Sequence, residues 1–170
     1  MGADKAVLTA AGKPMATWVG DAMVAAGIHP VVALGGRPPA GFRIIADEHP
    51  EGTGPLAAII GGLRACGDLF VCPCDVPTIS PAVVASILGA ASASDRPVVL
   101  ARTDRVEPLV GVYRLDALAG LEAGYERGAR GPRGALDSDS YELVDVPREA
   151  LRNVNTPEDL AVVEAVLLDR

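Results

Sequence analysis

Hydrophobic residues along this chain fall into two alternating patterns, short apolar runs and longer stretches with helical spacing. The short runs predict strands near residues 30–34, 42–46, 69–74, 97–101, 108–113 and 141–146. The longer stretches predict helices near residues 14–26, 55–66, 81–91, 115–125 and 157–170. Strands that alternate with helices indicate an α/β fold in three layers, with a mainly parallel sheet between helices on both faces.

Local sequence signals refine the boundaries of these elements. Ser80 and Thr156 each precede a proline, and each is suited to cap the helix that the proline begins. Asp159 stands three positions after Thr156, which is the spacing of a capping box. The segment 126–140 is rich in glycine, arginine and aspartate, and we expect it to be a mobile surface segment that can contain one helical turn.

The apolar run that begins at Leu69 ends on Asp75 and then on Pro77. A continuous run of this length predicts a strand buried on both faces. In open α/β sheets, ligands bind at the carboxyl ends of the strands, where Asp75 would lie. A carboxylate in that position can hold Mg²⁺ beside phosphate groups. The alternative is that Asp75 only stabilises the turn before the next helix.

Other polar or glycine positions are expected at the same edge of the sheet. Gly35, Asp47 and the loop 52–54 each follow a predicted strand, so they should converge with Asp75. Two carboxylates there could share one metal ion, or one could accept hydrogen bonds from a guanine base while the other binds the metal. Asn153 and Asn155 precede the last helix, where they serve either a site or the turn itself.

Composition restricts the classes of function. The 170 residues suffice for a single domain, and the 49% apolar content excludes a disordered chain. The formal net charge of −7, the absence of a Lys/Arg cluster and an aromatic content of 4% argue against nucleic acid as a partner. A small phosphorylated ligand remains compatible with this composition, because one lysine, a metal ion and backbone N–H groups can hold it.

The three cysteines, in an apolar setting and odd in number, indicate reduced thiols in a cytoplasmic protein. Cys72 and Cys74 do not have the spacing of a zinc site, and no apolar run has the length of a membrane span. His29 and His49 each precede a proline, and no Gly-x-Ser-x-Gly is present, so covalent catalysis has no support. Phosphoryl or nucleotidyl transfer assisted by metal and lysine remains open.

Taken in order, seven segments resemble the molybdenum cofactor guanylyltransferases, the MobA family of Rossmann-like nucleotidyltransferases. The resemblance covers almost the whole chain. The segments are Met1-Gly2-Ala3-Asp4-Lys5-Ala6, Gly12-Lys13-Pro14, Asp47, Gly54-Pro55-Leu56-Ala57, Cys74-Asp75-Val76-Pro77, Glu107-Pro108-Leu109, and Asn153-Val154-Asn155-Thr156-Pro157-Glu158-Asp159-Leu160.

The resemblance implies transfer of GMP from GTP to molybdopterin with release of pyrophosphate, and molybdoenzymes or cofactor-insertion proteins as candidate partners. It implies catalytic roles for Lys5 at the triphosphate and for Asp75 as the Mg²⁺ ligand. Gly54-Pro55-Leu56 favours GTP over CTP. By position, the nucleotide would contact Lys5, Gly35, Asp47, Gly54 and Asp75, and the molybdopterin side would be formed by Asn153 and Asn155.

One departure from the family pattern concerns the amino end. Family members carry a strand and a loop of the form Leu-Ala-Gly-Gly-x-Ser-x-Arg before the Met-Gly-x-Asp-Lys segment, whereas this sequence starts at that methionine. We therefore expect the first strand to be missing, two strands to face each other with unpaired backbone groups, and residues 1–170 to bind GTP weakly. The alternatives are a non-catalytic relative that binds a nucleotide or a molybdoenzyme, or a cytidylyl or sugar-nucleotide transferase on the same fold.

Overall fold

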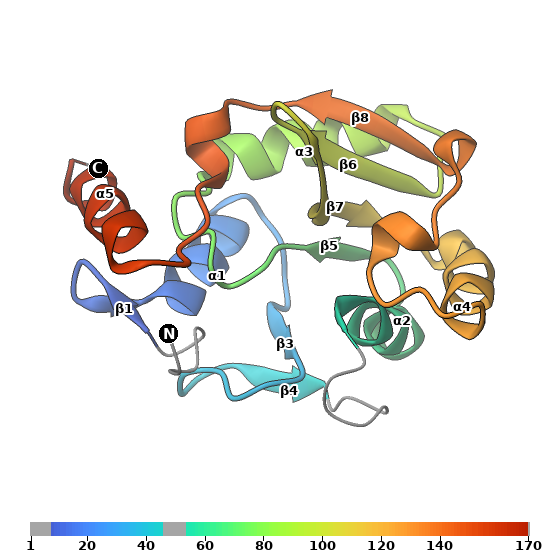
Figure 1. The fold of residues 1–170 in the computed structure, drawn as a ribbon, viewed down its shortest axis with the longest axis horizontal. Helices are drawn as coiled ribbons and strands as arrows, with labels where there is room; N and C mark the ends of the chain where they lie inside the picture. Colours follow the sequence, from blue (N-terminus) through green and yellow to red (C-terminus); the bar gives the residue numbers. More distant parts are fainter. Residues whose placement is uncertain (1–7, 46–53, 170) are drawn as a thin grey trace.

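The computed structural model describes residues 8–45 and 54–169 (Figure 1). Its strands are β1 (Thr9–Ala10), β2 (Lys13–Pro14), β3 (Val32–Leu34), β4 (Arg43–Ile45), β5 (Leu69–Val71), β6 (Val98–Arg102), β7 (Val106–Tyr113) and β8 (Tyr141–Asp145). Its α-helices are α1 (Met15–Ala25), α2 (Pro55–Cys66), α3 (Pro81–Ala93), α4 (Leu118–Glu126) and α5 (Pro157–Leu168). Short 3₁₀ turns are η1 (Leu115–Ala117), η2 (Pro132–Gly134), η3 (Ser138–Ser140) and η4 (Arg148–Leu151).

The largest sheet has the strand order β5-β7-β6-β8. The strand β7 runs antiparallel to both β5 and β6, whereas β6 and β8 are parallel, so the carboxyl ends of β5, β6 and β8 share one edge. The strands β3 and β4 form a separate parallel pair. The predicted α/β fold is therefore confirmed. The reversed direction of β7 follows from the short turn that joins it to β6, since so short a connection only permits a hairpin.

Helices cover both faces of this sheet, as the sequence predicts (Figure 1). On one face, side chains of α1 and α3 pack with alternate residues of the strands, including Phe70, Val99 and Val112. On the other face, side chains of α2 and α4 pack with the intervening residues, including Leu100 and Tyr113. The period of two along each strand thus divides the core into two clusters, one on each side of the sheet.

The strands β3 and β5 belong to different sheets, and no ladder joins them within the described residues. Helix α2 packs against both strands, because a Cβ at Gly62 would lie 2.7 Å from Cδ1 of Leu69 and 2.9 Å from Cδ2 of Leu34. The expectation that a missing strand leaves two strands with unpaired backbone groups stays a prediction. Side chains of β5 pack on both faces of the sheet as expected, Phe70 on one and Leu69 and Val71 on the other, although all three residues are only half-buried.

A third cluster joins the two ends of the described chain. Ala10, Met15, Val154, Val163 and Leu167 are buried together, so helix α5 packs against the β1–β2 hairpin and the start of α1. The backbone N–H of Ala11 also donates to the Glu164 carboxylate at 3.0 Å. Helix α5 therefore lies beside the amino-terminal hairpin, as Figure 1 shows.

The segment 126–140 contains a buried contact, at Ala135. Ala135 is 7% exposed and belongs to the cluster of α2 and α4, and the segment contains the two turns η2 and η3. This packing depends on Gly124, because a Cβ there would lie 2.3 Å from Cβ of Ala135. The polar composition of the segment concealed a few small apolar residues that pack closely on α4. Most of the segment lies at the surface as expected, its mobility stays a prediction, and the buried contact of Ala135 was not expected.

Within residues 8–45 and 54–169, none of the helices combines the length and the apolar character that crossing a bilayer requires.

Candidate functional site

The loop that follows β5 is bound to the segment that precedes α5. The backbone carbonyl of Asp75 accepts a hydrogen bond from the N–H of Val154 at 2.9 Å. Val154 is itself buried, so its two neighbours Asn153 and Asn155 are held on either side of this contact. The structure thus brings together three of the residues that the sequence places in the site.

Thr78 forms a second link between the same two segments. It is fully buried, its hydroxyl donates to the carbonyl of Ala150 at 3.2 Å, and the same oxygen accepts from the N–H of Arg152 at 3.1 Å. A buried hydroxyl that both donates and accepts fixes two backbone groups that would otherwise lack partners. The position of Asn153 relative to Asp75 is therefore set by two separate sets of hydrogen bonds.

The start of α5 has the predicted capping box. The Thr156 hydroxyl accepts from the N–H of Asp159 at 3.1 Å, and the Asp159 carboxylate accepts from the N–H groups of Asn155 and Thr156 at 3.0 and 2.9 Å. These bonds, led by the one from Asn155, lower the pKa of Asp159, and the charge of Arg152 adds to the effect. The turn at Asn155 is thus stabilised by the Asp159 carboxylate.

Two glycines of the predicted nucleotide side occupy conformations that suit glycine. Gly35 follows β3 with a φ of +69°, and its N–H donates to the carbonyl oxygen of Ile45 at 3.0 Å. Gly54 has a φ of +84°, and a Cβ there would lie 2.4 Å from the carbonyl oxygen of Arg130. The same oxygen accepts from the N–H of Leu56 at 3.1 Å. The loop before α2 is therefore held against the segment that follows α4.

Lys5 and Asp47, the other two residues expected on the nucleotide side, lie outside the described residues. Their placement at the site remains a prediction from the sequence. The expected convergence of Asp47 with Asp75 is likewise a prediction.

The described residues contain no group of three or more His, Cys, Asp or Glu side chains that could enclose a metal ion. Among the described residues, only Asp75 is predicted from the sequence to be a metal ligand. A Mg²⁺ site commonly uses one or two carboxylates together with substrate phosphates and water, so a single described carboxylate fits a metal that binds with the nucleotide.

The neighbouring cysteines do not offer a better ligand. Burial raises the pKa of the Cys72 thiol, and the charges of Asp75 and Cys74 raise it further. Cys72 also packs against the cluster of α1 and α3. A thiol with a raised pKa stays protonated, which agrees with its predicted role in packing.

A polar cavity of about 310 Å³ opens at the carboxyl ends of β6 and β8, on the same edge of the sheet as Asp75. It is lined by the β6–β7 turn, by η4 and by the start of α5. Asn153 lies in its wall, which connects the cavity to the Asp75 loop. Sequence reasoning missed this cavity as a whole, because its walls come from three separate segments.

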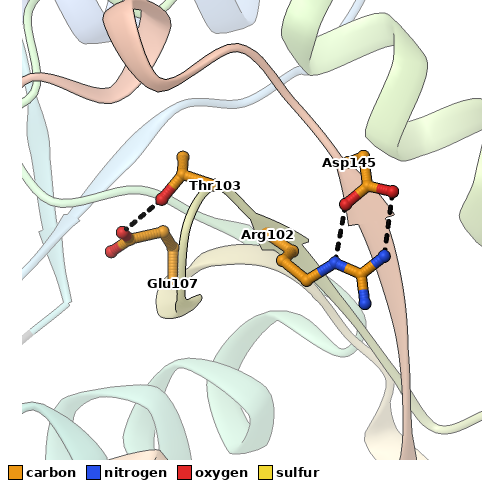
Figure 2. Close-up of polar contacts among 4 residues, drawn as sticks. All are labelled: Arg102, Thr103, Glu107 and Asp145. Atoms are coloured by element: carbon orange, nitrogen blue, oxygen red, sulfur yellow. Dashed lines mark hydrogen bonds and ion pairs between the residues drawn. The ribbon is translucent and has the colours of Figure 1, made fainter.

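Glu107 is the least exposed carboxylate in the ion pairs of this cavity, with 18% of its side chain exposed. Figure 2 shows the hydroxyl of Thr103 directed at Glu107, and the distance to Oε1 is 3.0 Å. Nε of Arg105 donates to the same oxygen at 3.0 Å. In the sequence, Glu107 opens the Glu107-Pro108-Leu109 segment of the family resemblance, but no role was predicted for its side chain.

A neighbouring ion pair fixes the ends of two strands beside the cavity. Nε and Nη2 of Arg102 donate to the two carboxylate oxygens of Asp145 at 2.6 and 2.8 Å (Figure 2). This paired geometry lowers the pKa of Asp145 through the hydrogen bonds from Arg102. The bond joins the last residue of β6 to the last residue of β8, from which the walls of the cavity extend.

A central sheet between two helical layers, with the backbone of Asp75 at a strand end bound to the segment before the last helix, is the arrangement of a Rossmann-like α/β domain. The chain belongs to the family of the MobA-like NTP transferase domain, whose model matches residues 1–143. This result confirms the family that the sequence motifs resemble.

Three curated relatives illustrate this membership. A probable molybdenum cofactor guanylyltransferase of Mycobacterium avium (strain 104) is 36% identical over 138 residues, covering 76% of this chain and 70% of that protein. The molybdenum cofactor guanylyltransferase of Pseudomonas fluorescens (strain Pf0-1) is 37% identical, covering 70% of this chain and 62% of that protein. That of Cereibacter sphaeroides is 32% identical, covering 98% of this chain and 89% of that protein. The match with the Pseudomonas relative thus spans less than two thirds of that protein's length.

Solved structures share the fold at lower identity. Molybdopterin-guanine dinucleotide biosynthesis protein A of Archaeoglobus fulgidus aligns with a TM-score of 0.78 at 23% identity, covering 99% of this chain and 93% of that chain. The 2-C-methyl-D-erythritol 4-phosphate cytidylyltransferase of Thermus thermophilus aligns with a TM-score of 0.74 at 19% identity, covering 96% of this chain and 94% of that chain. At these identities the likeness establishes the fold.

Proposed function

We propose that this protein transfers GMP from GTP to molybdopterin and releases pyrophosphate. The observation that carries the proposal is the contact between the Asp75 loop and the Asn153–Asn155 segment, in a chain that belongs to the MobA-like family. The names of the relatives from Mycobacterium avium and Cereibacter sphaeroides support the same activity. The three thiols, which form no disulfide, and GTP as the substrate favour the cytoplasm as the compartment.

In this proposal the nucleotide and the acceptor approach Asp75 from opposite sides. Lys5, Gly35, Asp47 and Gly54 hold GTP, and Asn153 and Asn155 contact molybdopterin. An oxygen of the terminal phosphate of molybdopterin attacks the α-phosphorus of GTP. The bond from that phosphorus to the oxygen bridging to the β-phosphate breaks, and pyrophosphate leaves with the bonding electrons.

Most of the catalytic effect would come from positioning and charge. Lys5 neutralises phosphate oxygens as negative charge shifts to the leaving pyrophosphate. Asp75 holds Mg²⁺, which when bound supplies positive charge beside the same phosphates. The hydrogen bonds of Val154 and Thr78 keep Asp75 and Asn153 in one fixed relation, which favours in-line approach of the two substrates.

The deciding experiment measures pyrophosphate release from GTP in the presence of Mg²⁺ and molybdopterin. It uses residues 1–170 and, in parallel, the same chain preceded by the strand and glycine-rich loop that the resemblance implies. We expect release with GTP and much less with CTP. Substitution Asp75→Asn is expected to lower kcat by about a hundredfold or more. The exposed Asp95, beyond α3, provides the matched control Asp95→Asn, which should leave the rate unchanged.

Each of the other outcomes contradicts the proposal in a different way. Pyrophosphate release that depends on CTP would assign the chain to cytidylyl transfer. Binding of GTP without any release, in both chains, would indicate a non-catalytic relative that binds a nucleotide or a molybdoenzyme. Full activity of the Asp75→Asn variant would remove Asp75 from the catalytic residues.

A further inference from the structure

Glu107 has one carboxylate oxygen that is bonded and one that is not. Thr103 and Arg105 both donate to Oε1, and Oε2 has no hydrogen-bond partner among the described residues. The side chain is 18% exposed and lines the cavity of about 310 Å³. A mostly buried carboxylate oxygen without a partner costs free energy, unless a ligand or water donates to it.

The wall of the cavity includes a residue that is predicted to contact the acceptor. Asn153 lines it, and the Val154 hydrogen bond ties that segment to Asp75. Gly35 and Gly54, the predicted nucleotide residues that the structure describes, do not line it. A ligand in this cavity would therefore contact Asn153 without contacting these glycines.

The charges of the cavity are balanced, which suits a polar ligand. Arg148 is paired with Asp104 at 2.9 Å, and Arg105 with Glu107. Arg152 and Asp159 also line the cavity; they form no ion pair within the described residues, but the charge of Arg152 helps to lower the pKa of Asp159. A phosphate in the cavity would share Arg152 with Asp159, while Oε2 of Glu107 accepts from a donor.

We infer that Glu107 recognises the amino-pyrimidinone ring of the acceptor substrate, through the exocyclic amine of that ring, which donates to Oε2. The two donors already on Oε1 occupy its lone pairs, so the ring presents the edge that carries the amine to Oε2. The pterin ring of the acceptor has this edge, and its phosphate would extend past Asn153 toward Asp75. The inference rests on the proposed function, because that function supplies a pterin as the second substrate.

Guanine presents the same edge as a pterin, so the experiment must separate the two sources. Free pterin is titrated into the full chain, and its intrinsic fluorescence is measured. Lumazine is the matched ligand, since it has the same two rings with a carbonyl oxygen in place of the exocyclic amine. GMP is then added at saturation to test for competition.

We expect pterin to bind about tenfold or more tightly than lumazine, because the lumazine oxygen would face the carboxylate. Substitution Glu107→Gln should abolish this preference. Glu122→Gln is the control, since Glu122 is bonded to Arg64 between α2 and α4, away from the cavity. Melting curves verify folding of both variants. If Glu107→Gln does not fold, the relative affinities of pterin and lumazine for the unsubstituted chain still test the inference.

Equal affinity for pterin and lumazine, or no affinity for pterin, would overturn the inference. An unchanged preference in the Glu107→Gln variant would overturn it as well. Displacement of pterin by GMP would assign the cavity to guanine and refute the acceptor role. Because these titrations need no turnover, selective pterin binding without pyrophosphate release would contradict the proposed function and leave the inference standing.

Discussion

The N–H of Val154 donates to the carbonyl of Asp75 at 2.9 Å and thereby joins the loop after β5 to the segment before α5, 79 residues later in the chain. Three residues beyond Asp75, Thr78 makes two more bonds to the same segment. The two sides of the candidate site are therefore not independent. A change in the loop after β5 should alter the position of Asn153.

Substitution Thr78→Val tests this coupling. The valine has the shape of threonine but leaves the carbonyl of Ala150 and the N–H of Arg152 without partners. We expect a loss of about 1–3 kcal/mol in the free energy of unfolding, measured by urea denaturation. The KM for the acceptor should rise more than the KM for GTP, because the displaced segment contains Asn153.

Ser92→Ala is the control for Thr78→Val. Ser92 also donates to a backbone carbonyl, that of Leu88 at 3.0 Å, but it is exposed on α3. Water can replace this bond, so stability and both KM values should stay nearly constant. Equal effects of the two substitutions would show that Thr78 does not link the two segments.

Sequence reasoning predicted the elements well where local signals decide them. Helix α2 has the expected bounds, and the capping box of Thr156 and Asp159 is present. The proximity of Asp75 to the segment of Asn153 and Asn155 agrees with the family resemblance, which implies that all three serve one site. The helix bounds and the cap depend only on the chain near each residue.

Features that depend on contacts between distant segments could not be predicted. The cavity around Glu107 combines a hairpin turn with arginines about 45 residues later, so the sequence shows only isolated charges. The packing of Ala135 depends on the close approach that Gly124 permits. In both cases a polar composition hides a specific tertiary contact.

The contact of Gly54 with Arg130 gives a second prediction. A Cβ on Gly54 would lie 2.4 Å from the Arg130 carbonyl oxygen, and the φ of +84° adds backbone strain. Gly54→Ala should therefore lower stability by more than the roughly 1–2 kcal/mol of strain alone, and should weaken GTP binding. Gly128→Ala is the matched control, since its φ is +101° but a Cβ there meets nothing within 4 Å. Thermal unfolding and nucleotide titration would show the difference, and equal losses would contradict the steric argument.

The capping box makes the stability of α5 depend on pH. The folded state lowers the pKa of Asp159 below its unfolded value of 3.8 through the N–H groups of Asn155 and Thr156. This contribution is therefore fully present above the unfolded pKa and is lost as the pH falls through the lower, folded pKa. The difference in melting temperature between the unsubstituted chain and Asp159→Asn should shrink as the pH falls from about 5 to about 2.

Asp116→Asn serves as the control in the same pH series, since Asp116 is exposed in η1 and belongs to no capping box. Its melting temperature should follow that of the unsubstituted chain throughout. A difference for Asp159→Asn that stays constant down to about pH 2 would show that its effect does not arise from the charged carboxylate.

The unpaired edges of β3 and β5 lead to the last prediction. Each strand pairs on one side only within the described residues, and helix α2 spans the space between Leu34 and Leu69. An apolar strand added between them would complete the backbone hydrogen bonds of both edges and cover their half-buried side chains. A chain that carries such a strand and its glycine-rich loop ahead of residue 1 should melt at least about 4 °C higher than residues 1–170.

The same addition should strengthen GTP binding, because the loop would bring backbone N–H groups to the triphosphate beside Asp75. Differential scanning calorimetry and nucleotide titration provide the two measurements. A control segment of equal length, with proline at alternate strand positions, cannot form the ladder and should change neither value. If the two segments gave equal melting temperatures, the edges of β3 and β5 would not be acceptors for a strand, and the gain in nucleotide affinity would need another cause.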